Sequence, residues 1–497
     1  MSLDLALHVA RSGLAAVQRG LAQTAQNVAN ADTPGYTRKA APQESMVAGG
    51  QPMGLRTAEA RRDVDAALST QLDASRSAAA GAAAREELLA VVEAAHGTAD
   101  GGGLSDALAG LREGMIALRA APGDTAAQFT ALEGARTVAG GLNRLSDAIG
   151  AARQRAQDGI VQEVVSANAA LREIAGLTLK IKAGGGDATL EDQRDQAVAR
   201  LSESIEVRAV RQPGGDMLLV ARGGLVLPLD PGRDVLVAPD ATVASGPLSG
   251  VSLNKTDITA QISGGRLGEF IKLRDSTLPR FQAEADTLAT TVAARLDAQG
   301  LRLFTDVDGT VPDPAQHYDG SAQIGFAGRI RINPAVDADP SLLRDGTRAV
   351  VGSAGGPSAF TPNPPGGPAA FTTLIDRVLD FAFGANAAAG VPWSPIRTNG
   401  LGPDGTLGSP FTAPPTVEGY AARMSSAQTG DRASAAAARS QAEDLTKVLE
   451  GKFDQRSGVD PDAEMATMVA LQNAYAANAR VFGTVQSMWD ALLSAVR

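Results

Sequence analysis

The chain has 497 residues, a formal net charge of −10 and no cysteine. An acidic chain is a poor partner for nucleic acid, because phosphates attract a basic surface. Without cysteine, disulfides, thiol nucleophiles and thiolate metal sites are excluded. Hydrophobic residues make up 44% of the chain but aromatic residues only 4%, so small side chains favour close helix packing over a large ligand pocket.

The length exceeds what one hydrophobic core usually supports, and we expect several domains. A cleavable signal would need a basic start before a short apolar run, and the sequence shows none. Since every apolar stretch is shorter than about 18 residues, we expect no membrane partner and no membrane span.

The first predicted helix covers about residues 3–31, with Asp4 in its first turn and Pro34-Gly35 after its end. Its apolar residues recur at alternating steps of four and three, which places them in one narrow seam. Such a seam predicts packing against a partner helix. We call these residues the N-terminal seam: Leu3, Leu7, Ala10, Leu14, Val17, Leu21, Thr24, Val28 and Ala31.

Glycine and proline residues, which break helices, then predict loops or short extended pieces over 33–60. Alanine-rich helical segments follow at about 62–96 and 104–120, and a very long helical run reaches about 182, where three glycines end it. One more helix is predicted up to about 203. Helices of this length pack as an elongated bundle.

The periodicity changes after this helix, because residues 205–211 alternate apolar and polar side chains and a return strand follows at 217–220. Strand-like pieces continue to about 262, and a helix returns at 266–299. The region 301–416 is rich in Gly and Pro. Within it we expect short strands near 326–332, no regular element over 355–368, and a helix near 371–383.

Two helices close the chain, at about 418–450 and 462–495. Asp460 is the expected N-cap of the last helix and Pro461 its first residue. Its apolar residues form a second three-four pattern, the C-terminal seam: Met468, Leu471, Tyr475, Asn478, Phe482, Val485, Trp489, Leu492 and Val496. A polar residue within a seam, here Asn478, is a candidate for fixing helix register.

The predicted fold is therefore mainly α with a β-containing insert, in an elongated multidomain protein. A terminal helical coiled-coil domain would comprise 1–35 and 460–497. A helical bundle would comprise 36–204, 263–300 and 417–459. A β-rich outer domain would comprise 205–262 and 301–416.

The end of the first helix carries a specific motif. Residues 20–38 read GLAQTAQNVANADTPGYTR, and the last helix contains LQNAYAANARV at 471–481. Both segments resemble the terminal signatures of the flagellar axial family, which contains rod, hook and hook-associated proteins. Residues 192–196 and 264–275 resemble the hook-associated proteins of the hook–filament junction. Another axial protein, the hook subunit or a distal rod subunit, is the alternative.

The resemblance implies a structural subunit outside the cell, in the bacterial flagellum, that assembles helically with copies of itself. It implies as partners the hook subunit, a second junction protein next to the filament, and an export chaperone at the C-terminal helix. It implies type III export, no cofactor and no catalysis. The expected assembly interface consists of Leu3, Leu7, Leu14, Val17, Leu21, Asn27, Val28, Asn30, Pro34, Gly35, Tyr36, Met468, Leu471, Tyr475, Asn478, Phe482, Val485, Trp489 and Leu492.

One motif points elsewhere. The run Asp306-Val307-Asp308-Gly309-Thr310 matches the D-x-D-G-T of phosphatases that use an aspartate nucleophile. The chemistry needs this loop at the end of a buried parallel strand, and no repeated βα pattern surrounds it. A calcium loop would need a glutamate where His317 stands. We favour a plain turn here. The three histidines, His8, His96 and His317, are far apart in sequence, with no second His at ligand spacing. We favour a surface or packing role for His8, and we expect no metal site.

Overall fold

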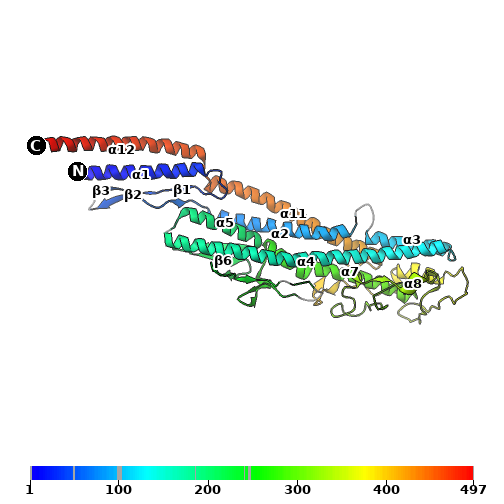
Figure 1. The fold of residues 1–497 in the computed structure, drawn as a ribbon. Helices are drawn as coiled ribbons and strands as arrows, with labels where there is room; N and C mark the ends of the chain where they lie inside the picture. The colour runs from blue at the N-terminus through cyan, green and yellow to red at the C-terminus, as the bar shows by residue number, and fades with distance from the viewer. Residues whose placement is uncertain are drawn as a thin grey trace.

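The computed structural model describes residues 3–48, 51–97, 103–184, 186–239, 241–243 and 248–495. The molecule is a long rod (Figure 1). Two helices from the chain ends, α1 (Leu3–Ala29) and α12 (Pro461–Ala495), project together from one end of a helical body. The chain therefore leaves this terminal pair, builds the body and returns, which confirms the predicted mainly α fold.

In the described part of the chain, seven helices build the body, and the longest of them is the 60-residue helix α4. They are α2 (Ala66–Ala95), α3 (Leu104–Ala120), α4 (Thr125–Gly184), α5 (Ala188–Ser204), α6 (Gly265–Lys272), α7 (Leu278–Ala298) and α11 (Val417–Ser457). A π-helical segment, η2 (Leu273–Thr277), joins α6 to α7. Aspartates begin several of these helices: the Asp65 carboxylate accepts hydrogen bonds from two amides of α2, and Asp460 caps α12 as predicted.

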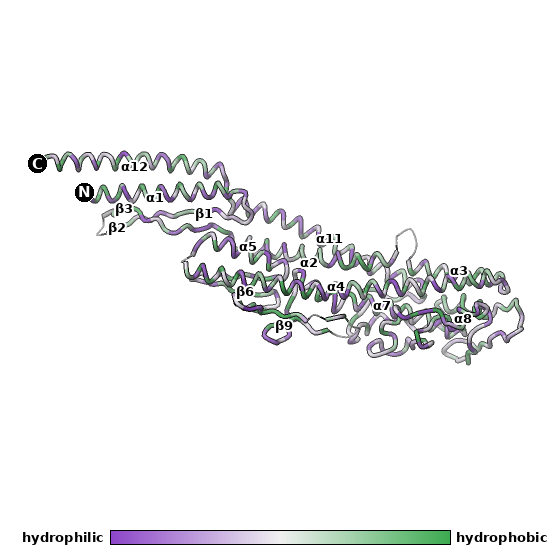
Figure 2. The backbone as a smooth tube through the Cα atoms, in the orientation of Figure 1, coloured by the Kyte–Doolittle hydropathy of each residue, from purple (hydrophilic) through white to green (hydrophobic). Residues whose placement is uncertain are grey.

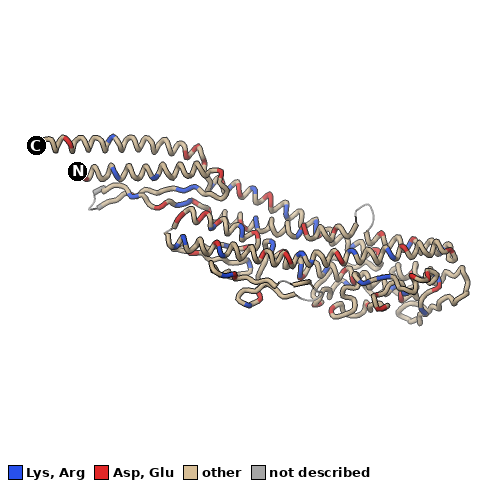
Figure 3. The backbone as a smooth tube through the Cα atoms, viewed as in Figure 1, with Lys and Arg blue, Asp and Glu red and all other residues tan. Residues whose placement is uncertain are grey.

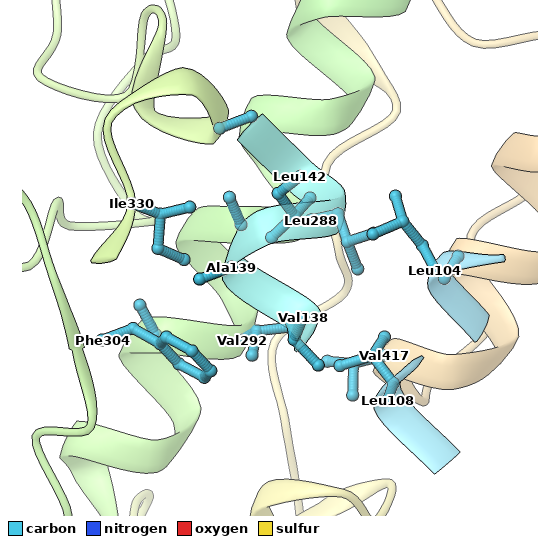
Figure 4. Packing of buried hydrophobic residues seen from close by; sticks show 14 of the residues in the cluster. Leu104, Leu108, Val138, Ala139, Leu142, Leu288, Val292, Phe304, Ile330 and Val417 are labelled. Atoms are coloured by element: carbon cyan, nitrogen blue, oxygen red, sulfur yellow. The ribbon is translucent and has the colours of Figure 1, made fainter. Parts of the chain in front are cut away.

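Among the described residues, the two largest hydrophobic clusters of the body together run along the length of α4. In the first, Leu108 of α3 and Val417 of α11 meet Val138 and Leu142 of α4, with Leu288 of α7 on the far side (Figure 4). The second packs the other half of α4 and α5 against the strands that follow them. In Figure 2 hydrophobic segments alternate with hydrophilic ones along these helices, as the buried and exposed faces of a bundle require.

The strands are short and scattered. They are β1 (Lys39–Ala40), β2 (Gln43–Ala48), β3 (Gln51–Thr57), β4 (Arg61–Arg62), β5 (Val207–Arg211), β6 (Met217–Ala221), β7 (Val226–Leu227), β8 (Leu236–Val237), β9 (Ser252–Leu253), β10 (Thr256–Asp257), β11 (Phe304–Thr305), β12 (Arg331–Ile332), β13 (Asn386–Ala388), β14 (Val391–Pro392), β15 (Asn399–Leu401) and β16 (Leu407–Gly408). All of their pairings are antiparallel. The predicted return strand is β6, which pairs with β5 from Val207↔Ala221 to Arg211↔Met217.

Residues 301–416 contain short helical pieces between these strands. These are η3 (Phe326–Gly328), α8 (Pro334–Ala338), α9 (Leu342–Asp345), α10 (Thr373–Arg377) and η4 (Val378–Ala382). The strands expected near 326–332 are confirmed only for β12; the prediction is wrong for 326–328, where a 3-10 turn buries Phe326 and Ala327. The buried hydrophobic residues of the second cluster include those between Val207 and Ile262, whereas most of those between Leu301 and Ile396 belong to the first. How the body divides into domains stays a prediction.

Candidate assembly site

The terminal helices α1 and α12 pack side by side in opposite directions (Figure 1). Close approach is possible because glycine faces the partner helix: a Cβ on Gly13 would lie 3.1 Å from Oδ1 of Asn478, and one on Gly20 would lie 3.2 Å from a methyl of Leu471. Ala10, Val17 and Thr24 are buried on the same helix. Small residues thus form the contact line of α1.

The N-terminal seam is only partly used inside the chain. Val17 is buried as predicted, but Leu7, Leu14, Leu21 and Val28 are half-buried. Leu14 and Leu21 each follow a contacting glycine by one residue, which turns them about 100° around the helix axis. They therefore flank the contact with α12 instead of filling it. Leu3 begins α1, and its side chain lies outside the described part of the chain.

The C-terminal seam is similarly divided. Val485 is buried, and Met468, Leu471, Asn478, Phe482 and Trp489 are half-buried. Tyr475 and Leu492 remain 39% and 47% exposed. Val496 lies outside the described residues. The amide of Asn478 donates to the carbonyl of Ala474 at 3.0 Å, so its side chain is held in place against Gly13.

Further large apolar side chains of α12 are open to solvent. The sequence prediction did not include them, because they lie off the three-four pattern: Met465, Val469, Val481, Met488 and Leu493, each between 48% and 61% exposed. Few charges cover the two terminal helices (Figure 3). A helix pair with so much exposed apolar surface is incomplete by itself.

A β-hairpin of β2 and β3 lies against α1 and was not predicted. Gly54 of β3 has φ +116°, and a Cβ there would lie 2.4 Å from Oγ of Ser12. The Ser12 hydroxyl also accepts the amide hydrogen of Leu55 at 3.1 Å. In β2, Met46 and Val47 are 44% and 64% exposed. The predicted surface role of His8 has a specific form, because its Nδ1 lies 3.2 Å from the Met53 carbonyl.

The signature segment after α1 folds back on the helix end. Asn27 is buried, and its side chain donates to the Lys39 carbonyl at 2.9 Å and accepts from the Lys39 amide at 3.2 Å. Tyr36 donates its hydroxyl hydrogen to Oδ1 of Asn27 at 2.9 Å. Burial, with Asp192 and Glu464 nearby, raises the pKa of Tyr36, which keeps this hydroxyl a donor.

The rest of the signature is more exposed. Asn30 donates to the Gln26 carbonyl at 2.9 Å, Pro34 is exposed, and Gly35 takes φ +74°. A Cβ on Gly35 would lie 2.6 Å from the side-chain nitrogen of Gln196, which donates to the Pro34 carbonyl at 3.0 Å. These signature residues thus contact the body of their own chain, a role that the sequence prediction did not assign.

The alternative motifs show no catalytic arrangement. The Asp306 carboxylate accepts hydrogen bonds from the amides of Asp308 and Thr310 and from the Thr310 hydroxyl, so it closes its own turn. This turn follows β11, whose partner is antiparallel, whereas the phosphatase reading needs a parallel strand. Within the described ranges, no group of three or more His, Asp or Glu could hold a metal ion.

His96 is buried and has a packing role. Its Nε2 lies 2.8 Å from Oε1 of Gln428, whose amide donates to the buried Glu284. Burial lowers the pKa of His96. In the described part of the chain, no helix combines the length and hydropathy that a membrane span needs.

Comparison with known proteins gives three family matches. The family described as "Flagella basal body rod protein" matches residues 7–37, which are most of α1 and the signature segment. "Flagellar basal body rod FlgEFG protein C-terminal" matches 451–495, which include α12. "Flagellar hook-associated protein FlgK helical domain" matches 89–311, in the body. All three matches are thus to flagellar protein families, with the two rod-type matches at the ends of the chain and the FlgK match between them.

Two known proteins are each similar to about half of the chain. The flagellar hook-associated protein 1 of Bacillus subtilis (strain 168) is 25% identical over 239 residues, which are 45% of this chain and 47% of that protein. The chain thus matches about half the length of this curated relative. The solved structure of the flagellar hook junction protein FlgK from Burkholderia pseudomallei is 24% identical, with a TM-score of 0.41, over 49% of this chain and 45% of that one.

Proposed function

We propose that the protein is a structural subunit of the bacterial flagellum at the hook–filament junction, and that it catalyses nothing. The carrying observation is the terminal helix pair, which is rod-type in sequence and leaves apolar side chains of α12 and of the β2–β3 hairpin open to solvent. The half-buried N-terminal seam adds to this surface. Apolar surface of this kind is stable in water only when other molecules cover it.

Other copies of the same chain are proposed to cover these exposed apolar side chains. The exposed residues of α12 and those of the hairpin are different patches, so a contact between them is heterologous and continues from subunit to subunit. Helical assembly through the terminal domain follows. The hook subunit and a second junction protein would border this assembly on its two sides. Before assembly, an export chaperone on α12 would shield the exposed side chains during type III export.

The test changes the exposed surface without touching the contact between α1 and α12. Met488→Asp and Leu493→Asp place a charge where we propose a neighbouring subunit, because both side chains are exposed. We expect the purified variants to keep their helical circular-dichroism spectrum and to be lost from isolated hook–filament structures, as judged by immunoblot, with loss of motility. Leu14→Asp and Phe482→Asp should also prevent incorporation.

Ala476→Asp is the matched control, since it adds the same charge at an exposed position of α12 that carries no large apolar side chain. Normal incorporation of Met488→Asp and Leu493→Asp would contradict the proposed interface. If the control also failed to be incorporated, any added charge on α12 would prevent assembly. The proposal of a specific contact through the apolar side chains would then be rejected.

A further inference from the structure

A buried carboxylate, Asp192 of α5, joins the terminal domain to the body. Both of its oxygens are occupied by donors from the segment that connects α1 to α2. Oδ1 accepts from the Thr37 hydroxyl at 2.6 Å and from Arg62 at 3.0 Å. Oδ2 accepts from the Lys39 ammonium at 2.7 Å and from the Thr37 amide at 3.3 Å. The side chains of Lys39, Arg62 and Asp192 are only 2% to 6% exposed.

The two cations reach Asp192 because a small sheet presents them together. Lys39 in β1 and Arg62 in β4 are direct cross-strand partners at the base of the hairpin. Arg62 also forms ion pairs with Glu191 and Asp195, on the same helix as Asp192. Burial lowers the pKa of Arg62, but Asp195, Glu191 and Asp192 outweigh this and raise it. Each cation of the cluster thus lies within ion-pair distance of a carboxylate of α5.

The same segment is tied to both terminal helices. Asn27 of α1 holds the backbone of Lys39 through both its amide and its carbonyl. Arg38 donates from its amide to the Ser457 carbonyl at 2.8 Å and from its side chain to the buried Glu464 of α12 at 2.6 Å. A movement of α1 or α12 relative to α5 would therefore have to break contacts at Asp192.

Part of the space between the signature segment and the body is open. A groove of about 880 Å³ lies between the signature segment and the body, lined by Tyr36, Leu72, Gln196 and Phe453 among others. Where a groove replaces apolar packing, polar contacts decide the geometry. We propose that Asp192 is the lock of a joint, and that its contacts with Thr37, Lys39 and Arg62 hold the terminal domain at one fixed orientation on the body.

The signature segment is then a device inside the molecule, independent of any contact between copies. A lock of this type is costly to break, because removing one partner leaves the others buried and unpaired. Asp192→Asn removes the charge that both cations face while nearly keeping the side-chain shape. Thr37→Val removes one donor from Oδ1 without changing any charge.

The experiment measures a distance across the joint in the full chain. The natural chain has no cysteine, so Ala25→Cys on α1 and Ala169→Cys on α4, both exposed, take spin labels at unique sites. Pulsed electron–electron double resonance should give one narrow distance peak between the two labels in the otherwise natural chain. It should lose that peak to a broad or shifted distribution in Asp192→Asn, and broaden partially in Thr37→Val.

Glu191→Gln is the matched control, because it neutralises the neighbouring carboxylate, which contacts Arg62 but not Thr37 or Lys39, and it should keep the narrow peak. Unchanged peaks in both test variants would overturn the proposal. A broad distribution in the natural chain would do the same. If Asp192→Asn loses its helical spectrum, Thr37→Val alone decides, and an unchanged peak in it rejects the lock.

Discussion

Asp73 of α2 is a carboxylate in an unfavourable place, beside the joint described above. Its side chain is 13% exposed, and the nearest cation, Arg76, is 3.8 Å away. Burial raises the pKa of Asp73 to about 7; Arg76 and Arg211 oppose this and Asp195 adds to it. An unfolded chain would ionise Asp73 near its ordinary pKa of 3.8. Between these two values the folded state holds a proton that the unfolded state has lost.

The sign of the pH effect follows from this difference. Below about pH 4 both states are protonated, and Asp73 costs nothing. As the pH rises towards 7, ionisation of Asp73 in the unfolded state lowers the free energy of unfolding by up to about 1.4 kcal/mol per pH unit. Above pH 7 both states are ionised, and the loss of stability stays constant. We expect Asp73→Asn to raise the melting temperature at pH 8 and to leave it nearly unchanged at pH 4.

Thermal unfolding of the variant and the natural chain from pH 4 to 8 checks this expectation. Glu113→Gln, an exposed position of α3, removes the same charge without relieving burial and serves as the control. If the melting temperatures of Asp73→Asn and of the natural chain changed in parallel with pH, the pKa of Asp73 in the folded protein would be close to its ordinary value.

At the scale of single elements, the α1–α12 contact shows what a sequence pattern reveals. Helix boundaries were predicted to within a few residues, because Pro34-Gly35 and Pro461 mark them clearly. The contacting face of α1 was predicted less well. A pattern of large apolar residues points to Leu14 and Leu21, whereas the closest contacts use Gly13 and Gly20. Glycine carries no hydrophobic signal, and its importance appears only with the partner in place.

The glycine contact can be tested directly. Gly20→Leu would force a side chain into Leu471 and push α12 away, because a Cβ alone already comes within 3.2 Å of it. We expect faster amide hydrogen exchange in both α1 and α12. Gly483→Leu on α12 is the control, since a Cβ there has nothing within 4 Å and leucine has a higher helix propensity than glycine. Equal exchange in both variants would mean that the glycine line does not set the helix spacing.

The candidate site was predictable in part for similar reasons. The two seams and the signature motif point to the terminal helices, and their described residues lie on α1, on α12 and in the segment that follows α1. The role of the signature was not predictable, because Thr37 and Lys39 meet Asp192 across more than 150 residues of chain. The hairpin itself was not predicted, and its segment was expected to form loops or short extended pieces, since Gly49, Gly50 and Gly54 break regular helices. Contacts that depend on folding of distant segments leave no local pattern.

For the whole molecule, the distribution of buried side chains predicts unequal stability. Helix α4 buries residues along its entire length, among them Leu132, Leu142, Ile160 and Ile174. In α12 only Glu464 and Val485 are buried. Local opening is easiest where little apolar surface is buried. The terminal domain should therefore open while the body stays folded, with the Asp192 joint as the boundary between the two.

Native-state hydrogen exchange on the purified full chain tests this division. We expect weak protection in α1 and α12 that falls towards the chain ends, and protection close to the global unfolding limit in the middle of α4. Protection should rise within the signature segment, because the Lys39 amide is bonded to Asn27 and the Thr37 amide to Asp192. In assembled junctions the terminal helices should become as protected as α4, since neighbouring copies would cover their apolar side chains. Full protection of α1 and α12 in the isolated chain would mean that the terminal domain is already complete, which would remove the physical reason for assembly through it.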